Sequence, residues 1–390
     1  MMRKKITEIF NIIYTKYNNS DSISLASGNG GIILFLFYYY RLTLNTKALN
    51  LANYILEKTI KIINNGEIYP SFCDGIAGIG WLIEHLEQNN FIECNTDTIL
   101  KDADHYLFNS MINDFNKGKG YDFLHGAIGK GLYLLKRKNI NTIYLENITN
   151  CLLETAESPK KDQLTWKSTH HQTGKLIYNL SLSHGITSII NFNSRLYKKG
   201  IAKKNSMKII QNTTNYLLNI RSTNKLSLFP NYIYLNEINN NASRMAWCYG
   251  DLGVGITLWQ SSQVLNDKKI EKKAIEILLH SSKRCDAIKN FVVDAGLCHG
   301  TSGIAHIFNR MHLNSGINEF KIASDFWFEE TIKMAKYNDG LAGFKAWRSP
   351  KYGGIQNDYG LLEGIAGIGL ALISTVSDIE PTWDECLLLS

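Results

Sequence analysis

Apolar residues recur along this chain of 390 residues at the spacing of one helix face. The clearest stripes follow Gly75 and Gly364. Their apolar members are Ile76, Ile79, Ile83 and Leu86 in the first segment, and Ile365, Ile368, Leu372 and Ile373 in the second. Steps of about three or four residues are typical of an α-helix with one buried face. Since only 5 prolines interrupt the chain, the pattern predicts a mostly helical protein.

A short glycine motif, Gly-x-x-Gly, stands at the head of each such segment. Its seven copies begin at Gly28, Gly75, Gly126, Gly185, Gly250, Gly300 and Gly364. The fourth copy is degenerate, because Ser188 replaces its second glycine. Successive copies lie roughly 50–65 residues apart, which is enough chain for two helices and their turns.

The recurring glycines indicate a shared steric constraint. Glycine inside a helix costs about 0.5–1 kcal/mol relative to alanine, so its return at one register indicates crowded helix starts. An open solenoid would also repeat, but it usually has more units and atypical ends. A closed ring of seven helix pairs uses every copy. We therefore expect an all-α protein, an α/α toroid built as a seven-fold double ring of helices, with residues 1–390 forming a single domain.

Two stretches between the repeats do not have a helical pattern. Insertions are predicted near residues 154–183 and 222–240, and the segment 226–235 is rich in β-forming residues but interrupted by Pro230. Both insertions should form short strands or loops. Their irregularity makes them candidate peptide-contact regions.

The composition narrows the class of protein. Hydrophobic residues make up 44% of the chain and charged residues 20%, which excludes a disordered or collagen-like chain. The net charge of +7 comes without an arginine-rich stripe, so no nucleic-acid partner is indicated. The longest apolar run, residues 30–40, is too short to cross a membrane, and the 7 scattered cysteines do not suggest a disulfide framework. These features predict a cytoplasmic protein, and the mild positive charge leaves peripheral binding at the inner face of the membrane open.

Reactive side chains gather just before the glycine motifs. In a ring, equivalent positions of the repeats would surround one opening. The residues there are Cys73, Asp74, Asp122, His125, His184, Trp247, Cys248, Tyr249, Cys298, His299 and Glu363.

Two of these cysteines occupy matching positions. Cys248 and Cys298 each lie two residues before the first glycine of their motif, and His299 adjoins the second cysteine. Two thiolates and an imidazole make three protein ligands for zinc, and an open fourth position is typical of a catalytic zinc. Buried cysteines can instead act as small hydrophobes. The shared register in two repeats favours the metal site.

Three motifs resemble those of the lanthionine synthetase C-like family. They are Trp247-Cys248-Tyr249-Gly250, Cys298-His299-Gly300 and the string of residues 361–367, Leu-Leu-Glu-Gly-Ile-Ala-Gly. The resemblance covers most of the chain and implies an α/α toroid that binds one Zn²⁺ through Cys248, Cys298 and His299. It also implies the activity of a stand-alone bacterial cyclase in lanthipeptide antibiotic biosynthesis, which forms lanthionine and methyllanthionine thioether rings.

The resemblance also implies a set of catalytic residues. Its positions match Asp122, His184, Arg244, Trp247 and Tyr249. Other roles remain open: Asp122 could cap the following helix, Arg244 could belong to an interior ion pair, and the two aromatic residues could pack in the core. Ser188, beside His184, departs from the glycine pattern and could change the angle at which the fourth helix starts.

The chemistry assigns a role to each group. Ring formation adds a peptide cysteine across the double bond of dehydroalanine or dehydrobutyrine. The thiolate is the nucleophile, and zinc deprotonates a thiol that it binds. The addition produces an enolate that needs a proton, for which His184 is the candidate acid. We expect Asp122 to orient that imidazole and Arg244 to neutralise the enolate oxygen.

The expected partner is a dehydrated lanthipeptide precursor, with its leader and core segments. A separate dehydratase would supply it, and an export transporter is a further candidate partner. Two other functions remain possible. One is a non-cyclising relative that binds glutathione or another thiol. The other is a sugar-cleaving toroid enzyme, which needs paired carboxylates such as Asp74 and Glu363.

Overall fold

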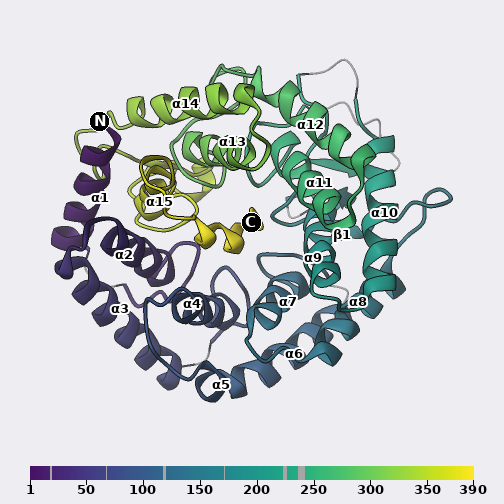
Figure 1. Cartoon of the computed structure of the whole chain (residues 1–390), viewed down its shortest axis with the longest axis horizontal. Coiled ribbons are helices and arrows are strands. Elements are labelled where there is room, and N and C mark those ends of the chain that lie inside the picture. Colours follow the sequence, from purple (N-terminus) through teal and green to yellow (C-terminus); the bar gives the residue numbers. More distant parts are fainter. Residues whose placement is uncertain (18–19, 67, 117–119, 171, 223–225, 236–241) are drawn as a thin grey trace. The chain divides into compact units, whose positions relative to one another are not determined.

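The packing of the chain divides it into two compact units (Figure 1). The computed structural model describes residues 1–17, 20–66, 68–116, 120–170, 172–222, 226–235 and 242–390. Unit 1 contains Met1–Thr96 and Cys285–Asp384, so it combines two distant parts of the sequence. Unit 2 contains Asp97–Arg284 and Glu385–Ser390.

Helices make up most of both units. Those of unit 1 are α1 (Met2–Lys16), α2 (Asn29–Thr43), α3 (Thr46–Asn65), α4 (Ile76–Gln88), α13 (Thr301–Ser315), α14 (Asn318–Lys333) and α15 (Ile365–Val376). Those of unit 2 are α6 (Lys101–Asn116), α7 (Ala127–Lys136), α8 (Thr142–Thr155), α9 (Ile186–Lys198), α10 (Lys203–Asn219), α11 (Asp251–Leu265) and α12 (Lys268–Ser282). The short α5 (Thr96–Ile99) and two 3₁₀ turns (Pro350–Tyr352 and Thr382–Leu387) complete the set. Across the described part of the chain, no helix has both the length and the apolar character needed to span a bilayer.

Each glycine motif begins a helix, as predicted. Its first glycine is the N-cap of α2, α4, α7, α9, α11, α13 or α15. The second glycine is needed because the preceding loop folds back over the first turn. A Cβ at Gly367 would lie 1.8 Å from the carbonyl oxygen of Leu361, and a Cβ at Gly78 would lie 2.0 Å from that of Phe72. At the degenerate copy α9 still begins directly after its motif glycine, and the Ser188 hydroxyl donates to the Gly185 carbonyl (2.7 Å).

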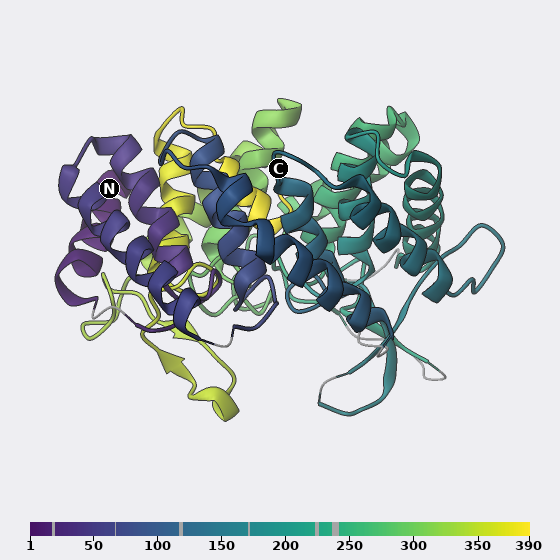
Figure 2. The same ribbon diagram turned by 90° about the horizontal axis from the view of Figure 1, so that it is seen from below.

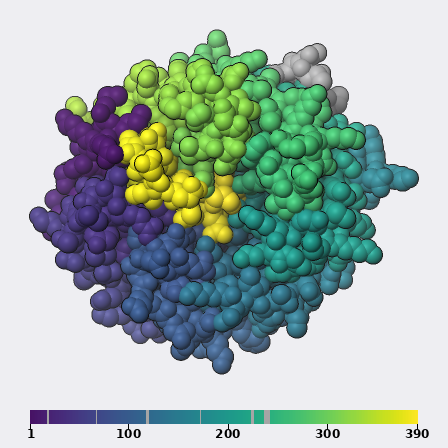
Figure 3. All heavy atoms as spheres, viewed as in Figure 1, coloured from purple at the N-terminus to yellow at the C-terminus, as the bar shows by residue number. Residues whose placement is uncertain are grey.

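The first and last repeats lie side by side in unit 1. Helix α15 packs against α2, and a second layer of α1, α3 and α14 covers these helices and α13 (Figure 1). The Leu361 N–H donates to the Ala26 carbonyl (2.8 Å), and the Ala26 N–H donates to the Cys73 carbonyl (3.1 Å). Atoms of α15 accordingly lie against those of the N-terminal segment (Figure 3). This contact between the ends of the repeat series is expected for a closed ring and absent from an open solenoid.

Unit 2 keeps its three motif helices in sequence order. Helix α9 packs against both α7 and α11, with α6, α8, α10 and α12 on their other side. The loops before α9 and α11 are joined, because the Leu182 N–H donates to the Cys248 carbonyl (3.0 Å). The segment 385–390 belongs to the same core, in which Leu388 and Leu389 are buried.

Strands occur in both predicted insertions. The first insertion carries β1 (Lys167–Thr169) and β2 (Leu176–Asn179), and the second carries β3 (Tyr232–Tyr234). They form an antiparallel sheet in the order β1-β2-β3. Residues 171, 223–225 and 236–240 of these insertions lie outside the described part of the chain.

A further hairpin was not predicted. It pairs β4 (Ala346–Trp347) with β5 (Ile355–Gln356) and projects below the helices of unit 1 in Figure 2.

Candidate functional site

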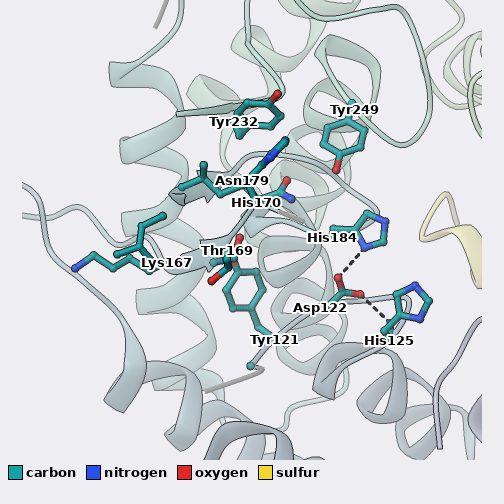
Figure 4. A pocket seen from close by; sticks show the side chains of 14 residues that line it. Tyr121, Asp122, His125, Lys167, Thr169, His170, Asn179, His184, Tyr232 and Tyr249 are labelled. Carbon is teal, nitrogen blue, oxygen red and sulfur yellow. Dashed lines mark hydrogen bonds and ion pairs between the residues drawn. The ribbon is translucent and has the colours of Figure 1, made fainter. Parts of the chain in front are cut away.

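A cavity of about 800 Å³ lies inside unit 2 (Figure 4). The loop before α7, the three-stranded sheet and the residues preceding α9 and α11 form its walls. Three of the predicted site residues line it: Asp122, His184 and Tyr249.

Asp122 and His184 form an ion pair at this cavity. The imidazole Nδ1 lies 2.7 Å from the carboxylate Oδ2, and the two side chains are 30% (His184) and 26% (Asp122) exposed. Since a carboxylate only accepts, Nδ1 carries the proton and Nε2 is the remaining nitrogen. The ring of His125 lies nearly parallel to that of His184, with centroids 5.8 Å apart.

Asp122 also caps the turn before α7, but it does not cap the helix itself, whose N-cap is Gly126 without a side-chain cap hydrogen bond. Its Oδ1 accepts the backbone N–H of His125, three residues later (2.8 Å). Serines stand at the equivalent position in three other repeats and accept the corresponding N–H with their hydroxyls: Ser24, Ser71 and Ser181. A serine has one oxygen for this task, whereas a carboxylate has two. The second oxygen of Asp122 is therefore available to His184.

The ion pair shifts the pKa values of both residues in the direction that favours their charged forms. Burial raises the pKa of Asp122, but the hydrogen bond and positive charge of His184 lower it below its ordinary value. Burial lowers the pKa of His184, and the hydrogen bond and negative charge of Asp122, with the charge of a Cys248 thiolate, raise it above 6.5. An imidazolium beside a carboxylate is thus favoured, and such a cation can act as a proton donor.

Tyr249 adds a neutral phenol to the same wall. Burial, followed by the negative charge of Cys248, raises its pKa to about 12. Its hydroxyl is hydrogen-bonded by the side chains of Asn179 and Ser181. At neutral pH this group is therefore a hydrogen-bond donor close to His184.

Two of the three candidate metal ligands, Cys298 and His299, lie in unit 1. The Cys298 N–H donates to the Leu362 carbonyl (2.8 Å), which positions the loop. His299 is only 7% exposed, and its Nε2 lies 3.3 Å from the Trp347 carbonyl and 3.2 Å from Asp294 Oδ2. Because a carbonyl only accepts, Nε2 carries the proton, which leaves Nδ1 as the ligand atom.

This donor set fits zinc. None of the seven cysteines, all of which lie in the described part of the chain, forms a disulfide, and the Nε2 of His299 has the carboxylate and carbonyl partners that zinc-binding histidines usually have. Cys248 belongs to unit 2, and the other two candidate ligands belong to unit 1.

Two predicted residues lie apart from the cavity lining. Trp247 is 1% exposed, and its indole N–H donates to the Leu387 carbonyl (2.8 Å), which anchors the residue before Cys248 in the core. Arg244 is half-buried at the sixth position before Gly250. Neither is among the described residues that line the cavity.

A carboxylate cluster in unit 1 is neutralised by arginine. Arg348, from the β4–β5 hairpin, lies 2.9 Å from Glu363 Oε2 and 2.6 Å from Asp358 Oδ2. Burial raises the pKa of Glu363, and the charges of Arg348 and His299 partly offset this effect. Asp74, the other carboxylate of the pair considered for a sugar-cleaving enzyme, accepts a hydrogen bond from the hydroxyl of Ser24 (2.9 Å).

Sequence reasoning missed Asp294 and Asn179. Both stand six residues before a motif glycine, the position that Asp358 occupies in the last repeat. All three side chains accept the backbone N–H two residues later, which belongs to Gly296 for Asp294, to Ser181 for Asn179 and to Gly360 for Asp358. A comparison of the repeats at that position would have found the three residues. Their second contacts depend on the tertiary structure and have no local signal.

Comparisons with known proteins identify the family and the fold of the chain. The family model described as Lanthionine synthetase C-like protein matches residues 19–388. Nisin biosynthesis protein NisC of Lactococcus lactis subsp. lactis is 25% identical over 400 residues, which cover 94% of this chain and 89% of that protein. Among solved structures, nisin cyclase matches with a TM-score of 0.78 at 20% identity, covering 100% of this chain and 96% of that chain. This likeness shows the fold, and the prediction of an α/α toroid is confirmed.

Proposed function

Because the chain belongs to the lanthionine synthetase C-like family, we propose that it is a lanthipeptide cyclase. In this function the enzyme adds cysteine thiolates of a dehydrated precursor peptide to dehydroalanine or dehydrobutyrine, which forms lanthionine or methyllanthionine rings. One observation carries the proposal: an Asp122–His184 ion pair, next to the Tyr249 phenol, faces a cavity large enough for a short peptide segment.

The proposal includes one zinc ion, held by Cys248, Cys298 and His299. The support for these ligands is their donor chemistry: two cysteines that are not in disulfides, and an imidazole whose Nε2 is already engaged by Asp294. When bound, zinc lowers the pKa of a thiol ligand, so that a substrate cysteine is available as thiolate at neutral pH.

The protein's own residues manage the proton. The thiolate sulfur bonds to the β-carbon of the dehydrated residue, and the electron pair of the double bond moves into an enolate. The His184 imidazolium then delivers its Nε2 proton to the α-carbon, while Asp122 keeps the other nitrogen protonated and the ring oriented. Tyr249, and the half-buried Arg244, are proposed to stabilise the negative charge on the enolate oxygen. Trp247 is proposed to position Cys248 through its bond to Leu387.

A sugar-cleaving enzyme is less consistent with the described carboxylates. A glycosidase needs one protonated and one charged carboxylate on either side of the substrate. Glu363 is in an ion pair with Arg348, and Asp74 accepts from Ser24, so each is engaged by a neighbour in its own unit.

The test uses the full chain and a dehydrated peptide with one cysteine and one dehydroalanine. Metal analysis should find one zinc per chain, and mass spectrometry should show loss of the free thiol without a change in mass. Cys298→Ala should lose both zinc and activity. Cys285→Ala, which changes an exposed cysteine outside the proposed site, should keep both.

The same experiment distinguishes the alternatives. His184→Asn should retain zinc and lose about 10²–10⁴-fold in cyclisation rate, the usual contribution of a general acid. Tight glutathione binding with no thioether formed would instead indicate a thiol-binding protein. Full activity of metal-free enzyme would contradict the zinc proposal.

The proposed partners of the enzyme and its proposed location follow from the activity. The substrate is the leader and core of a precursor that a separate dehydratase has modified, and the product would then be exported by a transporter. We propose a cytoplasmic location, with peripheral binding at the inner face of the membrane as a further possibility to test by fractionation.

A further inference from the structure

The three-stranded sheet presents an aromatic cluster on one of its faces. The register pairs Ser168 with Ile177 and Ile177 with Tyr234, while Asn179 pairs with Tyr232. Since side chains alternate between the two faces of a strand, these five residues share one face. Four of them border the cavity: Ser168, Ile177, Asn179 and Tyr232.

The cluster consists of His170, Tyr232 and Tyr234. The His170 ring lies 4.7 Å from that of Tyr232 and 5.8 Å from that of Tyr234, and the two tyrosine rings are 5.1 Å apart and nearly perpendicular. His170 is 7% exposed and is held by its backbone N–H, which donates to the Lys175 carbonyl (2.8 Å). The three rings are therefore in place before a ligand arrives.

Asn179 connects this cluster to the catalytic groups. It lies on the same sheet face as Tyr232, and its side chain is hydrogen-bonded to Tyr249. In Figure 4 the labelled rings of Tyr232 and Tyr249 lie on either side of Asn179, with His184 beyond Tyr249. One cavity thus has an aromatic end at the sheet and an acid–base end at Asp122 and His184.

The charges along the cavity indicate what the aromatic end can accept. Among the described residues of its lining, Asp122 is the single carboxylate, and it is paired with His184. Lys167 stands at the sheet edge in an ion pair with Glu157. A cationic side chain would therefore find no carboxylate partner in the lining, whereas an uncharged flat side chain would contact ring faces.

Building on the proposed function, we infer that the aromatic end is a substrate subsite. It binds an uncharged apolar or unsaturated side chain that flanks the reacting cysteine of the dehydrated peptide, against the packed rings of His170 and Tyr232. The occupant is a segment of the precursor core. Its binding selects which cysteine of the peptide is positioned to react.

The experiment compares peptides that differ only in the residue beside the cysteine: phenylalanine, leucine or lysine. Wild type should have the lowest KM for phenylalanine and the highest for lysine. Tyr232→Ala should raise KM for the phenylalanine and leucine peptides about tenfold, as expected for loss of one aromatic contact, while kcat and zinc content stay near wild type. Tyr232→Phe should restore the preference.

Tyr178 provides a matched control on the opposite face of the same sheet. It pairs with Lys167 and Ile233, and its ring contacts Tyr216, away from the cluster. Tyr178→Ala should leave the KM pattern unchanged. An equal rise in KM for Tyr178→Ala, or a Tyr232→Ala effect that is the same for all three peptides, would overturn the subsite.

Binding without reaction separates this inference from the proposed activity. Peptides that carry serine in place of cysteine cannot cyclise, and calorimetry can measure their affinity. Weaker binding of the phenylalanine peptide by Tyr232→Ala supports the subsite, and equal binding by wild type and variant overturns it. Failure of wild type to form any thioether would contradict the cyclase assignment and not the binding result.

Discussion

The cavity of unit 2 and the core of unit 1 each contain a histidine–aspartate pair, in opposite environments. The His184–Asp122 pair borders the cavity, and its side chains are about a quarter to a third exposed. The His306–Asp384 pair is fully buried, with Nε2 and Oδ2 2.8 Å apart. His306 Nδ1 is also engaged by the Ser374 hydroxyl (3.0 Å), so neither ring nitrogen has room for a substrate.

The difference shows that the pair itself does not identify a catalytic site. Asp384 also binds Arg310 through both carboxylate oxygens (2.7 and 3.1 Å), which makes the buried pair part of a structural network. Asp122 accepts a backbone N–H with Oδ1 and contacts His184 Nδ1 with Oδ2, which leaves Nε2 as the ring nitrogen without a described partner. Access to a cavity and one ring nitrogen without a described partner separate the pair that is proposed to be catalytic from the structural one.

The pair of His299 and Asp294 is intermediate in exposure between the Asp122–His184 pair and the His306–Asp384 pair. Their side chains are 9% and 2% exposed, and the aspartate holds one nitrogen of a histidine that is proposed to bind zinc with the other. A ligand needs a fixed tautomer and limited water access, whereas an acid needs a proton that it can release.

The largest effect is expected for Asp122→Ser, which introduces the residue found at this position in three other repeats. The serine can keep the turn cap, so the fold should survive. The pKa of His184 should fall, because the hydrogen bond and charge of Asp122 raise it in the wild type. We expect cyclisation to slow by about 10²–10⁴-fold.

The pH profile gives the sign of this effect. A general acid works below its pKa, so the alkaline limb of kcat should move to lower pH in Asp122→Ser. NMR titration of His184 with labelled histidine measures the same shift directly. An unchanged limb would show that another group supplies the proton.

Asp384→Asn should mainly reduce stability, by about 3–5 kcal/mol, because it leaves the buried Arg310 without a full countercharge. Urea denaturation measures the loss. Glu380→Gln is a matched control, since Glu380 also pairs with Arg310 but is 65% exposed, and it should cost at most about 1 kcal/mol. Similar losses in the two variants would contradict the importance of burial.

The pH dependence of that stabilisation follows from the pKa of Asp384. Burial raises this pKa, but His306 and Arg310 hold it below 3.8 in the folded protein. The charged Asp384 therefore stabilises the fold fully above the ordinary aspartate pKa of 3.8. This stabilisation is lost as the pH falls through the lower pKa that Asp384 has in the folded protein. Asp384→Asn should remove most of this acid sensitivity.

The smallest effect is expected for Asp294→Ala, which should weaken zinc binding by about 10–100-fold. Competition with a chelator measures it. Asp358→Ala is the matched control: Asp358 holds the equivalent loop in the last repeat, but its side chain contacts Arg348 instead of a histidine. Equal loss of zinc affinity in both variants would assign Asp294 to loop structure alone.

The sequence was sufficient for the fold because the constraint repeats. Seven glycines at one register locate seven helix starts, and at six of them a Cβ would collide with the loop carbonyl six residues earlier, whereas at Gly300 it would collide with Gly296 N and Asp294 Oδ1. Asp122 and His184 were among the reactive residues just before the glycine motifs, and the family resemblance implied their catalytic roles. The structure places Nδ1 of His184 2.7 Å from Oδ2 of Asp122. The local sequence pattern therefore predicted the helix starts, which all seven repeats share.

The parts that the sequence did not predict depend on contacts between distant residues. Strands of two residues, such as β4 and β5, are too short for a periodic pattern. The contact of His299 with Trp347 spans 48 residues, and that of Trp247 with Leu387 spans 140. Each of these depends on an insertion or a tail that has no counterpart in the other repeats.

The make-up of unit 1 has a consequence for how the protein is synthesised. Its core combines residues 1–96 with residues 285–384, whereas nearly all of unit 2 is one continuous stretch. During translation the middle of the chain can complete most of its packing first. The N-terminal helices must wait for α15 to leave the ribosome, and over that interval their apolar faces are exposed to chaperones and to aggregation.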